Sequence, residues 1–163
     1  MSMVTVSDVL IDVLLHALLC LGVGYLVWKM VKPKEKHSLL FSMISSFAAG
    51  LFIDVDHLFD YFMYTGFRFN IKDFIVGSYI KTGKIYIPLH GFEYVILLGF
   101  ILLFTESKLK RVVIASAMLA MLLHLLTDIS LYQTPPQLYF LLYRAANHFT
   151  FHTNPFHRPS LHS

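Results

Sequence analysis

Four long apolar segments alternate with polar connections along the chain, at about residues 8–28, 38–60, 86–105 and 112–132. A helix that crosses a bilayer needs about 20 predominantly apolar residues. Each segment reaches that length only when its ionisable side chains are included. The pattern therefore predicts an all-α fold, an integral membrane four-helix bundle with ionisable groups inside the membrane boundary.

The connections predict how these spans are oriented. Lys29–Lys36 and Glu106–Arg111 are short and basic, and the positive-inside rule places both on the cytoplasmic side. The N-terminus, the longer connection at 65–85 and the C-terminus are then expected outside. That connection mixes aromatic and basic side chains, which predicts an amphipathic segment lying in the membrane interface. Pro88 suits the first turn of the third span.

The last part of the chain is too short of apolar residues for a fifth span. A C-terminal amphipathic helix is expected at about 137–148, packed along the membrane. Residues 1–150 are thus expected to form one transmembrane helical domain. Residues 151–163 contain several histidines and prolines and are expected to be a flexible tail.

The composition agrees with a membrane protein. The 163 residues are 56% hydrophobic with a mean hydropathy of +0.64, whereas soluble domains are about 45–50% apolar even when glycine is counted. The net charge of +3 comes with basic loops between spans, so it does not indicate a nucleic-acid partner. Cys20 is the single cysteine, which excludes an internal disulfide.

Acidic and basic residues are distributed differently. No lysine or arginine lies in the interior of a predicted span, but seven of the ten acidic residues lie in or at the end of one: Asp8, Asp12, Asp54, Asp56, Asp60, Glu93 and Asp128. An isolated carboxylate at membrane depth costs roughly 2.5–3.5 kcal/mol on insertion scales. All of these groups fall at the same end of the antiparallel spans, the predicted outer half. A bound metal ion is the simplest partner for them.

The spacing of these residues supports a metal site. Residues three or four apart share a helix face, as do Asp54 with His57, His90 with Glu93, and His124 with Asp128. Imidazole and carboxylate without thiolate suit zinc, manganese or iron, so one or two divalent ions are expected, with zinc favoured. The predicted ligands are His16, Asp54, His57, His90, His124 and Asp128.

Four further carboxylates lie close to these ligands in the sequence. Asp60 is expected to hydrogen-bond to a ligand, and Asp12 is expected either to do the same or to bind the metal itself. Asp56 points away from Asp54 on a regular helix, so it needs a helix end, a bend or a second metal. Asp8 is expected to be an exposed acid at the start of the first helix.

The order of these motifs resembles a known family. An early histidine, "DVDH" at the end of the second span, "LHGFE" at the third and "HLLTD" in the fourth are similar to motifs of the bacterial and archaeal membrane-bound metal-dependent hydrolases, which include LexA-regulated inner-membrane proteins. Ile53 replaces a proline, and "LHGFE" lacks the "RGxTHS" of some members, so the resemblance is to a divergent branch.

The resemblance implies a prokaryotic cytoplasmic membrane and metal ligands drawn from His16, Asp54, Asp56, His57, His90, Glu93, His124 and Asp128. The function expected is metal-dependent hydrolysis of a phosphoester in a lipid or lipid-linked substrate. Glu93 or Asp56, whichever is not a ligand, is expected to act as the general base. Three alternatives stay open: a divalent-cation carrier or channel, a di-iron lipid oxidoreductase, and a non-catalytic protein whose polar cluster only joins its helices.

Overall fold

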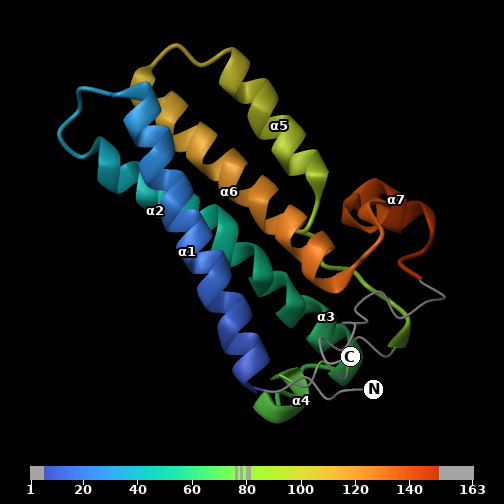
Figure 1. Cartoon of the computed structure of the whole chain (residues 1–163). Coiled ribbons are helices and arrows are strands. Elements are labelled where there is room, and N and C mark those ends of the chain that lie inside the picture. Colours follow the sequence, from blue (N-terminus) through green and yellow to red (C-terminus); the bar gives the residue numbers. More distant parts are fainter. Residues whose placement is uncertain (1–5, 76, 78, 80–81, 151–163) are drawn as a thin grey trace.

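In a computed structural model the chain forms an all-helical bundle, which confirms the predicted fold class (Figure 1). The structure describes residues 6–75, 77, 79 and 82–150, and the predicted tail at 151–163 and the side chain of Asp8 lie outside them. Within these residues there is no β-strand, and an isolated antiparallel bridge joins Lys84 to Thr150.

The helices follow the predicted apolar segments in order. They are α1 (Val6–Val31), α2 (Ser38–Leu51), the 3₁₀ turn η1 (Phe52–Val55), α3 (Asp56–Thr65), α4 (Ile71–Ile75), α5 (Phe92–Leu103), α6 (Lys108–Tyr132), the 3₁₀ turn η3 (Pro136–Tyr139) and α7 (Leu141–Ala146). Three stretches are long and apolar enough to cross a membrane: Val9–Val31, Ser38–Thr65 and Lys108–Tyr132.

The third predicted span, at 86–105, is shorter than expected. Its helix α5 has 12 residues and is about 18 Å long at 1.5 Å per residue, whereas the hydrocarbon core is about 30 Å thick. Residues 86–91 are not helical, and Pro88 precedes the helix instead of lying in its first turn. Carboxylates of α3 accept hydrogen bonds from backbone N–H groups of this segment, as described below, and hold it in a non-helical conformation.

The C-terminal amphipathic helix expected at 137–148 is interrupted. The chain forms η3, passes through Phe140 in an extended conformation and then forms the six-residue helix α7. Gln133 ends α6 in the left-handed conformation with φ of 50°. This reversal turns the chain back, and α7 lies beside the C-terminal end of α6 (Figure 1).

Helix α6 lies at the centre of the bundle and packs against α1, α2 and α5, while α1 also packs against α2. Small residues allow the close approach. A side chain at Gly24 would meet the backbone of Met43 in α2 at 2.9 Å, and one at Gly50 would meet the Sγ of Cys20. Cys20, Val23, Val27 and Ala120 form an apolar cluster next to these contacts.

Serines face one another in the same region. The Oγ of Ser42 lies 2.6 Å from the carbonyl oxygen of Gly24 and 2.7 Å from the Oγ of Ser116, so it joins three helices. Ser46 donates to the carbonyl of Cys20. We call this region, made of Gly24, Ser42, Ser46 and Ser116, the serine region.

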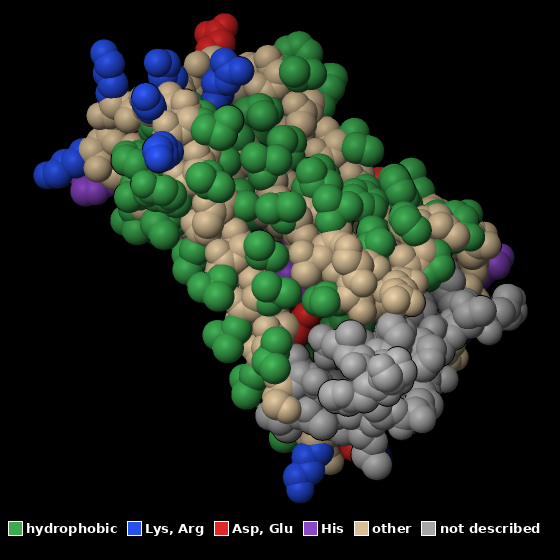
Figure 2. All heavy atoms as spheres, viewed as in Figure 1, with side chains coloured by type: hydrophobic (Ala, Val, Ile, Leu, Met, Phe, Trp, Pro, Cys, Tyr) green, Lys and Arg blue, Asp and Glu red, His purple; other side chains and the backbone are tan. Residues whose placement is uncertain are grey.

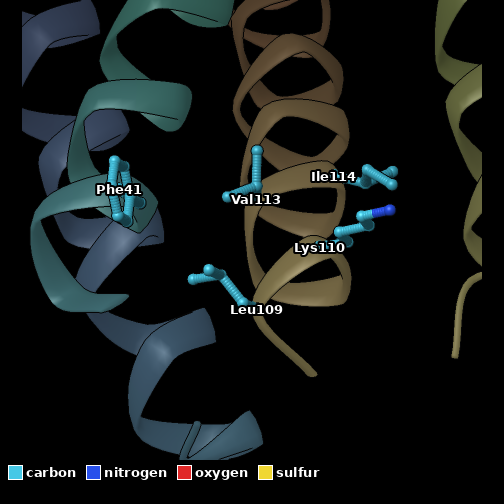
Figure 3. A pocket seen from close by; sticks show the side chains of 5 residues that line it. All are labelled: Phe41, Leu109, Lys110, Val113 and Ile114. Atoms are coloured by element: carbon cyan, nitrogen blue, oxygen red, sulfur yellow. The ribbon is translucent and has the colours of Figure 1, made fainter. Parts of the chain in front are cut away.

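The two short basic loops lie at the same end of the bundle, as predicted. Figure 2 shows most of the visible Lys and Arg side chains at that end and apolar side chains along the flank. An apolar depression between α2 and α6 lies near the basic end, lined by Phe41, Leu109, Lys110, Val113 and Ile114 (Figure 3). Lys110 is the single ionisable residue that lines it, and none of the predicted site residues does so.

Candidate metal centre

The predicted ligands come from four separate parts of the chain. Helix α1 provides His16, the η1–α3 junction provides Asp54 and His57, the segment before α5 provides His90, and α6 provides His124 and Asp128. The 3₁₀ turn η1 interrupts the α-helical repeat between Leu51 and Asp56. Because a 3₁₀ turn has about 3.0 residues instead of 3.6, it changes the directions of Asp54 and Asp56, which supplies the bend that Asp56 required.

Imidazole nitrogens and carboxylate oxygens converge at the centre of this cluster. Nε2 of His124 lies 3.3 Å from Oδ1 of Asp54 and 3.2 Å from Oδ2 of Asp128. Nε2 of His90 lies 3.4 Å from the same oxygen of Asp54 and 3.6 Å from Oδ2 of Asp128. Nε2 of His16 lies 3.3 Å from Oδ1 of Asp128. The two carboxylates thus link the three imidazoles into one cluster.

The two Nε2 atoms of His90 and His124 lie only 3.3 Å apart. Two sets of three residues each have one ligand atom apiece within 4.8 Å of the others: His16, His124 and Asp128, and Asp54, His57 and His90. The first set is buried throughout, whereas Asp54 and His57 in the second are partly exposed. Adjoining sets of this kind can hold one or two metal ions.

Outer contacts fix which nitrogen faces the cluster in His16 and His90, whereas Nδ1 of His124 has no hydrogen-bond partner among the described residues. Nδ1 of His16 lies 2.9 Å from the carbonyl oxygen of Asp12, and a carbonyl can only accept, so Nδ1 carries the proton and Nε2 is free to bind. Nδ1 of His90 lies 2.9 Å from Oδ1 of Asp56. Carboxylate and carbonyl partners of this kind orient metal-binding histidines. The hydroxyl of Tyr132 in turn donates to Oδ2 of Asp12 at 3.1 Å.

Asp56 and Asp60 also hold the segment that carries His90. Oδ2 of Asp56 accepts the backbone N–H groups of Leu89 at 2.6 Å and His90 at 3.2 Å. Oδ1 of Asp60 accepts those of Tyr86 at 2.9 Å and Ile87 at 3.0 Å. These bonds support Ile87 at a positive φ of 24°, an unfavourable conformation for a β-branched residue. Both carboxylates therefore position a ligand-bearing segment that is not itself helical.

Glu93 is placed differently from the other predicted residues. Its Oε1 accepts the backbone N–H of Leu142 at 3.0 Å, in the first turn of α7. Burial opposes ionisation of this carboxyl, but the hydrogen bonds from the backbone of Leu142 and its neighbours outweigh that effect and lower the pKa of Glu93. The carboxylate thus fastens α7, and none of the ion pairs in the described part of the chain joins it to the cluster.

His57 is the most peripheral of the predicted ligands. Its Nε2 lies 4.0 Å from Oδ1 of Asp54, and its ring lies 5.0 Å from the ring of His90. The remaining five predicted ligands, His16, Asp54, His90, His124 and Asp128, are joined by contacts of 3.2–3.6 Å. The spacing argument thus selected residues that the fold brings together.

The sequence reasoning missed Arg144. This arginine in α7 is fully buried, and its Nη2 donates to the carbonyl oxygen of His90 at 3.0 Å. Its signal in the sequence was an arginine within the apolar stretch "YFLLYRAA", since a buried charge requires a partner.

The separations within the cluster fit a metal centre. Ligand atoms bonded to a tetrahedral zinc ion at 2.0–2.1 Å are roughly 3.3 Å from one another. The contacts described above between ligand atoms of the five joined residues measure 3.2–3.6 Å, and Nε2 of His16 has no hydrogen-bond partner of its own. Three imidazoles and two carboxylates also form the ligand set expected for zinc, manganese or iron.

Comparison with known proteins gives this chain no relative: no family model, no curated protein and no solved structure matches it.

Proposed function

We propose that this protein is a membrane-embedded metal-dependent hydrolase whose substrate is a phosphoester in a lipid or lipid-linked molecule. The observation that carries the proposal is the convergence of three Nε2 atoms on two carboxylates at the spacing of metal ligands. Zinc is the ion we expect, with manganese or iron as the other candidates.

The five joined residues, His16, Asp54, His90, His124 and Asp128, are the proposed ligands, and His57 is in place to complete a second ion site beside Asp54. A divalent ion held there would lower the pKa of water toward 7 and polarise the ester that is cleaved. Asp128 is buried, with 9% of its side chain exposed, whereas Asp54 has 35% exposed. We therefore assign Asp54 to the side from which water and substrate arrive.

The two carboxylates expected from the sequence as general bases have different positions. Asp56 contacts a proposed ligand, through Nδ1 of His90, whereas Glu93 binds α7. We propose that Asp56 orients His90 by accepting its Nδ1–H, and that Glu93 acts on the position of α7.

The surroundings of Asp54 support a lipid-borne substrate. Phe52, Val55 and Phe59 flank it in the sequence and are 47–62% exposed, in a stretch long and apolar enough to cross a membrane. Apolar side chains exposed at this depth face lipid. We therefore expect a phosphate group attached to a lipid to approach Asp54 from the membrane side.

The experiment that tests this function is elemental analysis of untagged protein purified in mild detergent. We expect one or two zinc, manganese or iron ions per chain, and their loss from a His124→Ala/Asp128→Ala variant. A Ser116→Ala variant, changed two turns away on the same helix α6, is the matched control and should keep its metal.

Activity is measured on the same preparations. Metal-dependent release of phosphate from a phosphatidic acid vesicle, abolished by a chelator and restored by the metal, is expected of the wild type and of Ser116→Ala but not of the double variant. Wild-type protein that holds no metal after resupply contradicts the proposal, because the cluster would then be a polar network that only joins helices.

A further inference from the structure

Arg144 is the one lysine or arginine among the described residues whose side chain is buried, with 0% of it exposed. It lies in α7, after the last spanning helix, and its Nη2 donates to the backbone carbonyl of His90 at 3.0 Å. A buried guanidinium is retained only where charges and hydrogen bonds compensate for its desolvation. Its partner here belongs to a proposed metal ligand.

Within the described part of the chain, the guanidinium of Arg144 has one hydrogen bond, and its Nε and Nη1 atoms are buried without a hydrogen-bond partner. Burial lowers the pKa of Arg144, and the nearby carboxylates of Asp56, Glu93 and Asp60 oppose that shift. The bond from Nη2 to His90 is therefore the contact that fixes the guanidinium. Two of these carboxylates, Asp56 and Asp60, are the ones that bind the backbone of residues 86–90, so Arg144 is electrostatically coupled to the same segment.

His90 is thus held at three places. Asp56 contacts Nδ1 of its ring and also accepts its backbone N–H, and Arg144 donates to its carbonyl oxygen. His90 lies on a non-helical segment, where the N–H of His90 also donates to the carbonyl of Ile87 in a turn at 3.1 Å. The carbonyl oxygen of His90 is held from α7, by Arg144.

We propose that Arg144 is a positioning residue that orients His90 toward the metal ion. The inference rests on the proposed metal centre, and it gives α7 the role of supporting one of the metal ligands. Partners of this kind typically change metal affinity by about 10- to 100-fold when they are removed.

A different role must be separated from this one, since α7 is also fastened by Glu93 through the N–H of Leu142. If Arg144 served only to hold α7 in place, breaking the Glu93 contact should have the same consequence. Glu93→Ala is therefore the matched control, because it removes the hydrogen bond from the N–H of Leu142 in α7 and leaves the hydrogen bonds of His90 intact.

The test is a zinc titration of full-length metal-free protein in detergent, with a competing chelating dye. We expect Arg144→Met to raise the apparent Kd by about 10- to 100-fold, and Arg144→Lys, which keeps a charged donor, to recover most of the affinity. Glu93→Ala should stay within about 3-fold of the wild type. If Arg144→Met is not recovered as folded protein, Arg144→Gln is titrated in its place with the same expectation.

Cobalt substitution gives the second readout, because the visible absorption of Co²⁺ reports its ligand geometry. Arg144→Met should change that spectrum, and Glu93→Ala should preserve it. Unchanged affinity and spectrum in Arg144→Met, or equal effects in Glu93→Ala, would overturn the positioning role while leaving the metal centre intact. Absence of metal binding in the wild type would instead overturn both proposals.

Discussion

The serine region buries polar side chains between α1, α2 and α6, and the histidine–aspartate cluster buries them between α1, the η1–α3 junction, the segment before α5 and α6. The contacts in the two regions differ in kind. Ser42, Ser46 and Ser116 are 0% exposed, and their hydroxyls bond to backbone carbonyls or to each other. In the cluster, Nε2 atoms face one another and share carboxylate oxygens at distances longer than those serine contacts.

This difference indicates which buried polar groups need a ligand. A hydroxyl is both donor and acceptor, so all of its hydrogen bonds can be made to groups of a neighbouring helix. An imidazole whose Nδ1–H is already used has only an acceptor at Nε2, and a carboxylate has only acceptors. Acceptors that converge require a proton or a cation between them. The serine region is satisfied by its own hydrogen bonds, whereas the cluster needs either protonated imidazoles or a cation.

The largest expected effect follows from removing the carboxylate that three imidazoles share. Asp54 lies within 4.0 Å of His57, His90 and His124. Asp54→Ala should lower metal affinity by more than the roughly 100-fold expected for an outer partner, and abolish phosphate release. Isothermal titration with zinc and the vesicle assay measure both. Retention of full activity by this variant would show that the ligands are wrongly assigned.

A smaller loss is expected from Asp56→Asn, because Asp56 orients a ligand without being one. Metal affinity should fall about 10- to 100-fold, with the number of ions at saturation unchanged. Asp60→Asn is the control, since Asp60 holds the same segment at Tyr86 and Ile87 but does not touch the ring of His90. Equal losses in both variants would mean that only the backbone of 86–90 matters.

In the serine region the expected effect is on stability and not on metal binding. Gly24→Ala places a Cβ 2.9 Å from the Cα of Met43 and pushes α1 from α2, at a cost of about 1 kcal/mol, the lower end for overpacking. Gly22→Ala is the control on the same helix, because its Cβ meets nothing within 4 Å. Thermal unfolding in detergent, followed by fluorescence of Trp28, compares them. Destabilisation of both alike would contradict the contact.

The smallest change is predicted for Ser42→Ala. Hydrogen bonds between membrane helices contribute about 0.6 kcal/mol on average, and Ser42 contacts Gly24 and Ser116. The melting temperature should decrease slightly, while the zinc Kd stays within error of the wild type. A change in zinc affinity would show that the two regions are coupled, and the comparison between them would then fail.

Several properties of the site could be predicted from local sequence. Spacings of three or four residues selected His124 with Asp128 and Asp54 with His57, because helical geometry alone brings such pairs together. The serine region could not be predicted in this way, although "LLFSMISSFAAG" contains serines four residues apart. The hydrogen bonds of Ser42 and Ser46 depend on residues of α1 and α6, which spacing within one segment does not reveal.

The sequence by itself determined the apolar helices, the common end of the ionisable groups and the candidate ligands, because hydropathy and helical periodicity are local properties. The tertiary structure decided that residues 86–91 leave the helix, that Asp56 turns toward His90, and that Arg144 reaches its carbonyl. Those outcomes depend on backbone N–H groups and carboxylates that are about 30 residues apart in the chain. Only folding brings them within hydrogen-bond distance, so no local pattern encodes them.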